Sequence, residues 1–238
     1  MDADLHPFVT ARAWPNAQIS EAFEQWEPKH VADLVQGPGV VSGAYFHAVI
    51  SGVPEAFTGS GTIMAYYTAR EVDGLFAFLQ SQVFADAVAE GEQWFGGFHP
   101  TDWEDITGNI YVVDSVERRA DGSAHPELTF WQRFEVPEER LAEFDAWAAA
   151  HARALAAAGG VERVRTFSAV REGCPLPYYY SRGNRMVAAD AGSLDVLIAP
   201  EVRAAVGDSL RWDLELEYVR RDVYRHLYHH DSGHGGEY

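Results

Sequence analysis

The chain has 238 residues, of which 47% are apolar and 13% aromatic, enough for one or two packed domains. Its 36 acidic and 18 basic residues give a net charge of −18, which argues against general nucleic-acid binding and against docking on anionic lipid. The single cysteine, Cys174, excludes an intramolecular disulfide and an all-cysteine zinc site. We find no signal peptide and no apolar run near ~18 residues, so a cytoplasmic protein with no membrane partner is expected.

An internal repeat organises the sequence. Residues 21–40 and 142–161 align at an offset of 121, and the offset becomes 122 at the pair Met64/Met186. Chance matching of tryptophan, histidine and glycine at one offset is very unlikely, so we treat the duplication as real. The identical pairs in the aligned segments are Phe23/Phe144, Trp26/Trp147, His30/His151, Leu34/Leu155, Gly39/Gly160 and Val40/Val161.

The elements of the two copies follow the same order. In the first copy we expect strands at 8–14, 40–50, 62–68 and 109–116, and helices from Ser20 to Gly37 and at about 72–90. Phe23, Trp26, His30 and Leu34 form one face of the first helix because they recur at helical spacing. In the second copy we expect strands at 128–136, 161–170, 185–189 and about 212–224, and helices at 142–158 and about 194–205.

This order, β-α-β-β-α-β twice, predicts an α+β fold of two tandem ferredoxin-like units. Each unit covers one sheet face with helices, so the two remaining faces can be buried against each other as an intramolecular α+β barrel. The predicted boundaries are 1–118 for the first unit and 126–230 for the second, with a polar linker between them. Residues 231–238 are predicted to be a flexible tail.

The pattern Phe23-x-x-Trp26-x3-His30-x3-Leu34-x4-Gly39-Val40 resembles the EthD-like members of the dimeric α+β barrel superfamily. The resemblance implies this fold, with the usual pair of subunits carried in a single chain. It implies function less directly, because the superfamily includes cofactor-free cyclases, anthrone monooxygenases, isomerases and lyases. It also includes chlorite dismutases, aldoxime dehydratases and dye-decolorising peroxidases, which bind haem.

Four residues are candidates for catalysis. His30 and its repeat counterpart His151 lie on the apolar helix face, where burial leaves a neutral imidazole that can act as a base. His47 occurs in the first copy only, because Ser168 replaces it in the second. The Tyr66 phenol can donate to a developing oxyanion. The structural alternatives are a core histidine for His30 and His151, a surface residue for His47, and a tyrosine that fills a sheet face for Tyr66.

Aromatic residues supply the candidate substrate-binding set. Strand alternation places Tyr45 with His47 on one sheet face and Phe46 on the other. His99 and Trp103 lie in a loop rich in glycine and aromatic residues, which forms either a pocket mouth or a packed loop. The whole predicted set is Trp26, Tyr45, Phe46, Tyr67, His99, Trp103, Tyr111 and Trp147.

The C-terminal stretch contains metal-ligand residue types at His229, His230, Asp231 and His234. Adjacent histidines on an extended segment point to opposite faces, so we predict no metal site there. Phosphate-loop, dinucleotide-binding and catalytic-triad motifs are missing from the sequence.

The leading hypothesis is a cofactor-independent cyclase, lyase, isomerase or dehydratase that acts on a hydrophobic, aromatic or polyketide-like small molecule. His30 would be its general base, with Tyr66 or His47 orienting the substrate in a pocket lined by Trp26 and Phe46. The alternatives are a haem enzyme with His151, His30 or His226 as axial ligand, and a non-catalytic binding protein. Self-association of the chain stays open.

Overall fold

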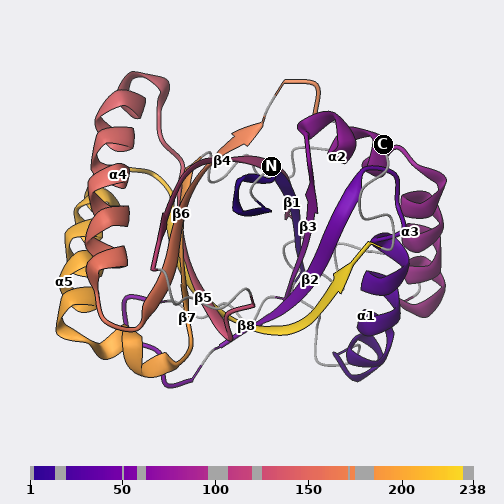
Figure 1. The fold of residues 1–238 in the computed structure, drawn as a ribbon, viewed down its shortest axis with the longest axis horizontal. Helices are drawn as coiled ribbons and strands as arrows, with labels where there is room; N and C mark the ends of the chain where they lie inside the picture. Colours follow the sequence, from indigo (N-terminus) through magenta and orange to yellow (C-terminus); the bar gives the residue numbers. More distant parts are fainter. Residues whose placement is uncertain are drawn as a thin grey trace.

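Eight strands close into one antiparallel barrel with helices on its outside (Figure 1). The structure is a computed structural model that describes residues 3–13, 20–49, 51–57, 63–95, 107–119, 125–170, 172–174 and 185–232. The strand order around the barrel is β1-β3-β2-β8-β5-β7-β6-β4, and β4 pairs with β1 to complete the ring. The predicted fold, two ferredoxin-like units in one barrel, is confirmed.

The first unit contains β1 (Phe8–Ala13), α1 (Ser20–Leu34), β2 (Val40–Ala48), β3 (Ile63–Ala69), α2 (Val72–Leu79), α3 (Gln82–Phe95) and β4 (Thr107–Arg118). The second contains β5 (Leu128–Phe134), α4 (Leu141–Ala157), β6 (Val161–Val170), β7 (Arg185–Ala191), α5 (Pro200–Ser209) and β8 (Val219–Asp231). Short 3-10 helices occupy Ala3–Leu5, Glu138–Arg140, Leu194–Ile198 and Leu210–Leu214.

Two predicted elements are wrong in detail. The single helix expected at 72–90 is two helices, because Ser81 caps the second: the Phe84 N–H donates to its Oγ at 3.2 Å. The last strand was expected to begin near Trp212, but Trp212 is buried in a 3-10 helix and β8 begins at Val219. Since β8 continues to Asp231, the histidines before it lie on a strand, and His234 lies outside the described residues.

The strand registers reproduce the sequence repeat. Tyr45 pairs with Ala65 across β2 and β3, and Thr166 pairs with Val187 across β6 and β7, which are the same positions at offsets of 121 and 122. The two units then join through β2 with β8 and through β4 with β6. Closure in this way leaves the barrel without a free sheet edge.

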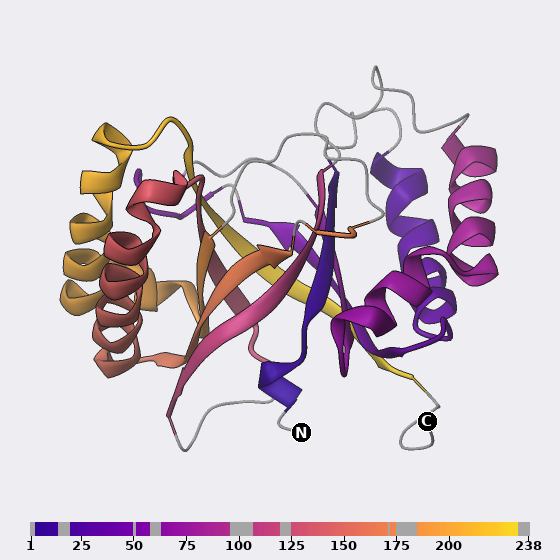
Figure 2. The ribbon, with the colours of Figure 1, turned by 90° about the horizontal axis from the view of Figure 1, so that it is seen from above.

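The two faces of the sheet pack against different things. Figure 2 shows α1–α3 and α4–α5 as layers on opposite sides of the barrel, each covering one unit's half of the sheet. Inside the barrel, alternate side chains form an aromatic and apolar plug. Its fully enclosed members are Phe8, Met64, Tyr111, Trp131, Phe167, Met186, Ala188 and Tyr224. Small-molecule sites can therefore lie in a helix–sheet layer or at an end of the barrel.

Candidate functional site

A buried carboxylate and a histidine meet between α1 and the sheet of the first unit. Glu27 on α1 has no exposed surface, and its Oε1 and Oε2 lie 3.0 and 3.2 Å from Nε2 of His47 on β2. A carboxylate can only accept hydrogen bonds. Nε2 of His47 therefore carries the ring proton and donates a hydrogen bond to Glu27. The other ring nitrogen, Nδ1, is then the unprotonated one and can accept a proton.

Two tyrosines face the same carboxylate. The Tyr45 hydroxyl donates a hydrogen bond to Glu27, and burial, followed by the Glu27 charge, raises the Tyr45 pKa well above its usual value. Burial first, and Glu27 second, also raise the pKa of Tyr67. The Tyr67 hydroxyl is buried and has no hydrogen-bond partner among the described residues. Both phenols therefore stay protonated, and that of Tyr67 has a hydrogen to donate.

His30 and Trp26 line the α1 side of this layer. Their rings stack with centroids 3.8 Å apart, and His30 Nδ1 is buried without a partner among the described residues. Burial lowers the pKa of His30 to about 3. His30 is therefore neutral at pH 7, as expected, but such a low pKa makes it a weak base.

The second unit keeps the stacked pair and loses the polar cluster. His151 stacks on Trp147, burial lowers its pKa to about 4, and its Nε2 lies 2.8 Å from the Gln132 amide. Trp147 donates from Nε1 to Asp208 at 2.7 Å. The counterparts of Glu27, Tyr45, His47 and Tyr67 are Ala148, Thr166, Ser168 and Ala189. The acid–base cluster therefore belongs to the first unit alone.

The remaining predicted residues lie elsewhere. Phe46, Tyr66 and Tyr111 face the barrel interior, so the single pocket expected to combine Trp26 with Phe46 and Tyr66 is wrong. The alternation of side chains along each strand puts Trp26 on the opposite side of the sheet from the other two. His99 and Trp103 lie outside the described residues.

Sequence reasoning missed Glu27, although a signal was present. The residue lies beside the apolar stripe of α1, next to Trp26, and its repeat counterpart is an alanine. Glu27 is a polar residue at a core-facing position of the helix, and the second copy has an apolar residue there. Such a difference indicates that the polar residue has a function in the first copy.

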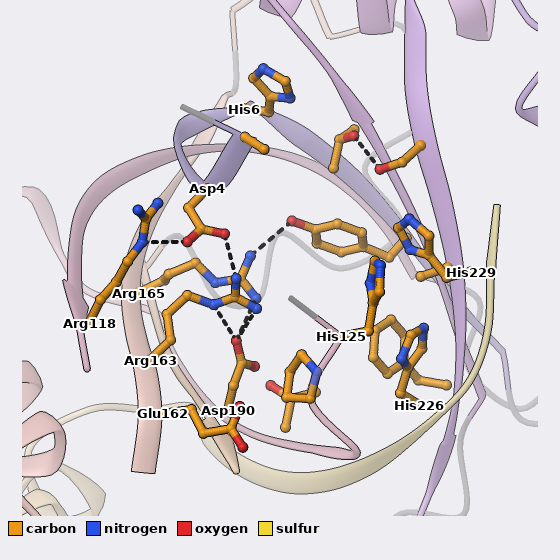
Figure 3. Close-up of a pocket in the computed structure, with 18 of the residues that line it drawn as sticks. Asp4, His6, Arg118, His125, Glu162, Arg163, Arg165, Asp190, His226 and His229 are labelled. Atoms are coloured by element: carbon orange, nitrogen blue, oxygen red, sulfur yellow. Dashed lines mark hydrogen bonds and ion pairs between the residues drawn. The ribbon is translucent and has the colours of Figure 1, made fainter. Parts of the chain in front are cut away.

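A second group of polar residues lines a pocket of about 730 Å³ at one end of the barrel, near the N-terminal 3-10 helix (Figure 3). We call it the barrel-end pocket. Tyr66 and Phe46 lie in its wall, His125, His226 and His229 gather on one side, and an ionic cluster occupies the other. The cluster contains Asp4, Arg118, Arg163, Arg165 and Asp190.

Within the described ranges, no three His, Cys, Asp or Glu side chains form a group that could hold a metal ion. No helix in those ranges is both long and apolar enough to cross a membrane.

The sequence matches no family model, and no curated protein is significantly similar to it. Solved structures do share the fold. An anthrone oxidase-like protein superimposes with a TM-score of 0.68 at 15% identity, over 97% of this chain and 95% of its own. A proposed monooxygenase from Fusobacterium nucleatum gives 0.62 at 11% identity, over 98% and 97%. Another from Lactobacillus acidophilus gives 0.56 at 8%, over 96% and 97%. The chain thus has the full-length fold of these α+β barrels.

Proposed function

We propose that the chain is an enzyme that moves protons on a small aromatic or polyketide-like molecule, using the Glu27–His47 pair of the first unit. The hydrogen bond between the buried Glu27 carboxylate and His47 Nε2 carries the proposal. It fixes the tautomer in which Nδ1 is the basic atom, which is how carboxylate–histidine pairs prepare a general base. The EthD-like assignment from the motif between Phe23 and Val40 is part of the same proposal.

In the proposed reaction, Nδ1 of His47 removes a proton from a carbon next to a carbonyl group. The C–H bond breaks, its electron pair moves onto the carbonyl oxygen, and Tyr67 donates a hydrogen bond to the resulting enolate. The imidazolium, stabilised by Glu27, then returns the proton to a different atom. The sequence is redox-neutral and can serve an isomerisation, an aldol-type cyclisation or an elimination.

The assignment changes the role of His30. A pKa of about 3 leaves it with little driving force to take a proton at pH 7, whereas its ring, stacked on Trp26, presents an apolar surface. His30 and Trp26 therefore contact the substrate's aromatic body in this proposal. An aromatic substrate is consistent with the name of the anthrone oxidase-like structural relative.

Haem, the alternative cofactor, fits the candidate axial ligands poorly. Nε2 of His151 is engaged by Gln132, and Nε2 of His226 is engaged by the backbone carbonyl of Tyr228 at 2.9 Å. Nδ1 of His30 has no hydrogen-bond partner among the described residues, but it is buried and its ring is stacked on Trp26. We therefore derive no step through haem. Addition of haemin with recording of the Soret band is the direct check.

The experiment is hydrogen–deuterium exchange on carbon acids, with anthrone and 1-phenylbutane-1,3-dione as probes in D2O. We expect wild type to exchange at least one probe faster than buffer, and His47→Asn to lose that acceleration. Ser168→Ala, at the counterpart position of the second unit, should exchange like wild type. Acceleration that survives in His47→Asn, or buffer-rate exchange of both probes with wild type, would reject the proposal.

A further inference from the structure

We propose that the barrel-end pocket is a second ligand site, for a small molecule that carries one carboxylate on an aromatic body. The pocket faces the barrel interior, whereas the Glu27–His47 pair faces α1 on the other side of the sheet. The inference is therefore independent of the proposed function.

One guanidinium group of the ionic cluster, that of Arg165, is only loosely paired with a carboxylate. Asp190 accepts from Arg163 Nε at 2.6 Å, and Asp4 binds both Arg163 and Arg118, the latter at 2.6 Å (Figure 3). Arg165 reaches Asp190 only at 3.4 Å. The described residues that line the pocket include four arginines and four carboxylates, and among these arginines Arg165 has its Nε buried without a hydrogen-bond partner. A largely buried guanidinium group whose contact with Asp190 is 3.4 Å long favours an anionic ligand that can pair with it more closely.

Three buried polar groups that line the pocket lack hydrogen-bond partners among the described residues. They are Nε of Arg165, Nε1 of Trp131 and Oγ1 of Thr129. Trp131 is 2% exposed and Thr129 is 3% exposed, so solvent water has little access to hydrogen-bond with their polar atoms. Buried donors left unpaired cost free energy, which a ligand acceptor recovers. A carboxylate has two oxygens that accept several hydrogen bonds, which suits this set.

The rest of the pocket suits a flat apolar body. Phe46 and Tyr66 line it, and His226 stacks on Phe46 with ring centroids 5.0 Å apart. Burial lowers the pKa of His226 and of His125, so these two imidazoles are uncharged at pH 7. A volume of about 730 Å³ is in the range of sites that enclose a drug-sized molecule.

The charge of the cluster favours a monoanion over phosphate. One loosely paired guanidinium group is matched by one carboxylate, whereas a dianion would bring excess negative charge beside Asp4 and Asp190. The repeat counterparts of Arg163 and Arg165 are Ser42 and Ala44, so these two arginines have no equivalent in the first unit. The duplicated barrel thus carries the Glu27–His47 pair in one half and the two pocket arginines, Arg163 and Arg165, in the other.

The test is isothermal titration of the full chain with 2-naphthoate, with its neutral isostere 2-naphthamide, and with inorganic phosphate. We expect 2-naphthoate to bind at least tenfold more tightly than the amide, and phosphate not to bind measurably. Equal affinities for the acid and the amide, or no heat from 2-naphthoate at millimolar concentration, would overturn the proposal. So would phosphate binding as tightly as 2-naphthoate.

Variants locate the binding. Arg165→Gln should remove the preference for acid over amide, and Trp131→Phe, which deletes only the indole N–H donor, should weaken 2-naphthoate several-fold. The matched control is Arg225→Gln, which removes the same charge from an exposed pair with Glu127 outside the pocket and should bind like wild type. If Arg165→Gln does not fold, the affinities of Trp131→Phe and Thr129→Val for 2-naphthoate test the site instead. Wild-type affinity in both would place the ligand elsewhere and reject the site.

Discussion

Nε2 of His47 lies 3.0 Å from Oε1 of Glu27, a carboxylate with no exposed surface that α1 holds against β2. Burying a carboxylate costs free energy, so a chain that needed only packing at this position would use an apolar residue. The second unit has Ala148 at the same position and forms the same helix–sheet layer. The Glu27–His47 pair is therefore dispensable for the fold.

Glu27→Gln is expected to separate function from stability. The amide keeps the shape but loses the charge that stabilises the imidazolium of His47, so proton exchange on a confirmed probe should fall at least tenfold. The free energy of unfolding should stay within about 1 kcal/mol or rise, because the desolvation cost of the carboxylate is removed. Glu143→Gln, on the exposed side of α4, is the control. Unchanged exchange in folded Glu27→Gln would contradict the role given to the pair.

The sequence predicted the fold well because both of its signals are local. Helical spacing of Trp26, His30 and Leu34 and the two-residue alternation of Tyr45, Phe46 and His47 each describe one element. The repeat then indicated the topology, which no single element contains. Each of the two units leaves one sheet face uncovered, and the simplest way to bury both faces is to pack them against each other in a barrel.

The candidate site was only partly predictable, because it depends on contacts between elements. Alternation alone separates Tyr45 from Phe46, yet the predicted pocket combined residues from both sheet faces. The ionic cluster of the barrel-end pocket could not be predicted from the sequence at all, because its members come from different elements. Asp4, Arg118, Arg163 and Asp190 are far apart in the sequence and meet only when β4 pairs with β6 and β6 with β7.

Stability should fall between neutral and mildly acidic pH because two buried histidines resist protonation. The folded pKa values of about 3 for His30 and about 4 for His151 lie below the unfolded value near 6.5. Between these values the unfolded chain binds more protons, so the free energy of unfolding decreases as the pH drops from about 6.5 towards 4.

Each histidine should contribute about 1 kcal/mol to the loss between pH 7 and about pH 5.5. This loss of unfolding free energy is measured by urea unfolding at both pH values, for wild type and for the double variant His30→Gln/His151→Gln. The loss should be smaller in the double variant, and an equal loss in both proteins would show that other groups dominate. Comparison of the two proteins cancels the contribution of the carboxylates they share.

A buried ion pair at the other end of the barrel should be expensive to break. Arg133 Nη2 donates to Asp222 Oδ2 at 3.0 Å, and the side chains are 5% and 0% exposed. Asp222→Ala leaves the guanidinium buried without this partner, so we expect it to lower the free energy of unfolding by about 3–5 kcal/mol. Glu127→Ala breaks the exposed pair with Arg225 and should cost less than about 1 kcal/mol. Similar losses for the two variants in urea would contradict this ranking.

The turn that ends α1 requires glycine at position 39 for two reasons, its left-handed backbone and its close contact with α2. Comparison with Gly52 separates the two effects. Gly39 has φ +79°, and a Cβ there would lie 2.7 Å from the Cα of Gly74 at the start of α2. Gly52 has a similar φ of +75° but nothing within 4 Å of its Cβ position. Gly52→Ala should therefore cost only the left-handed backbone strain, about 1–2 kcal/mol, whereas Gly39→Ala adds a clash between two backbones. Urea unfolding should show Gly39→Ala to be less stable than Gly52→Ala by at least about 1 kcal/mol, since closely packed backbones do not relax as a flexible side chain does. If the two variants lost the same stability, the contact between Gly39 and α2 would not be what requires glycine.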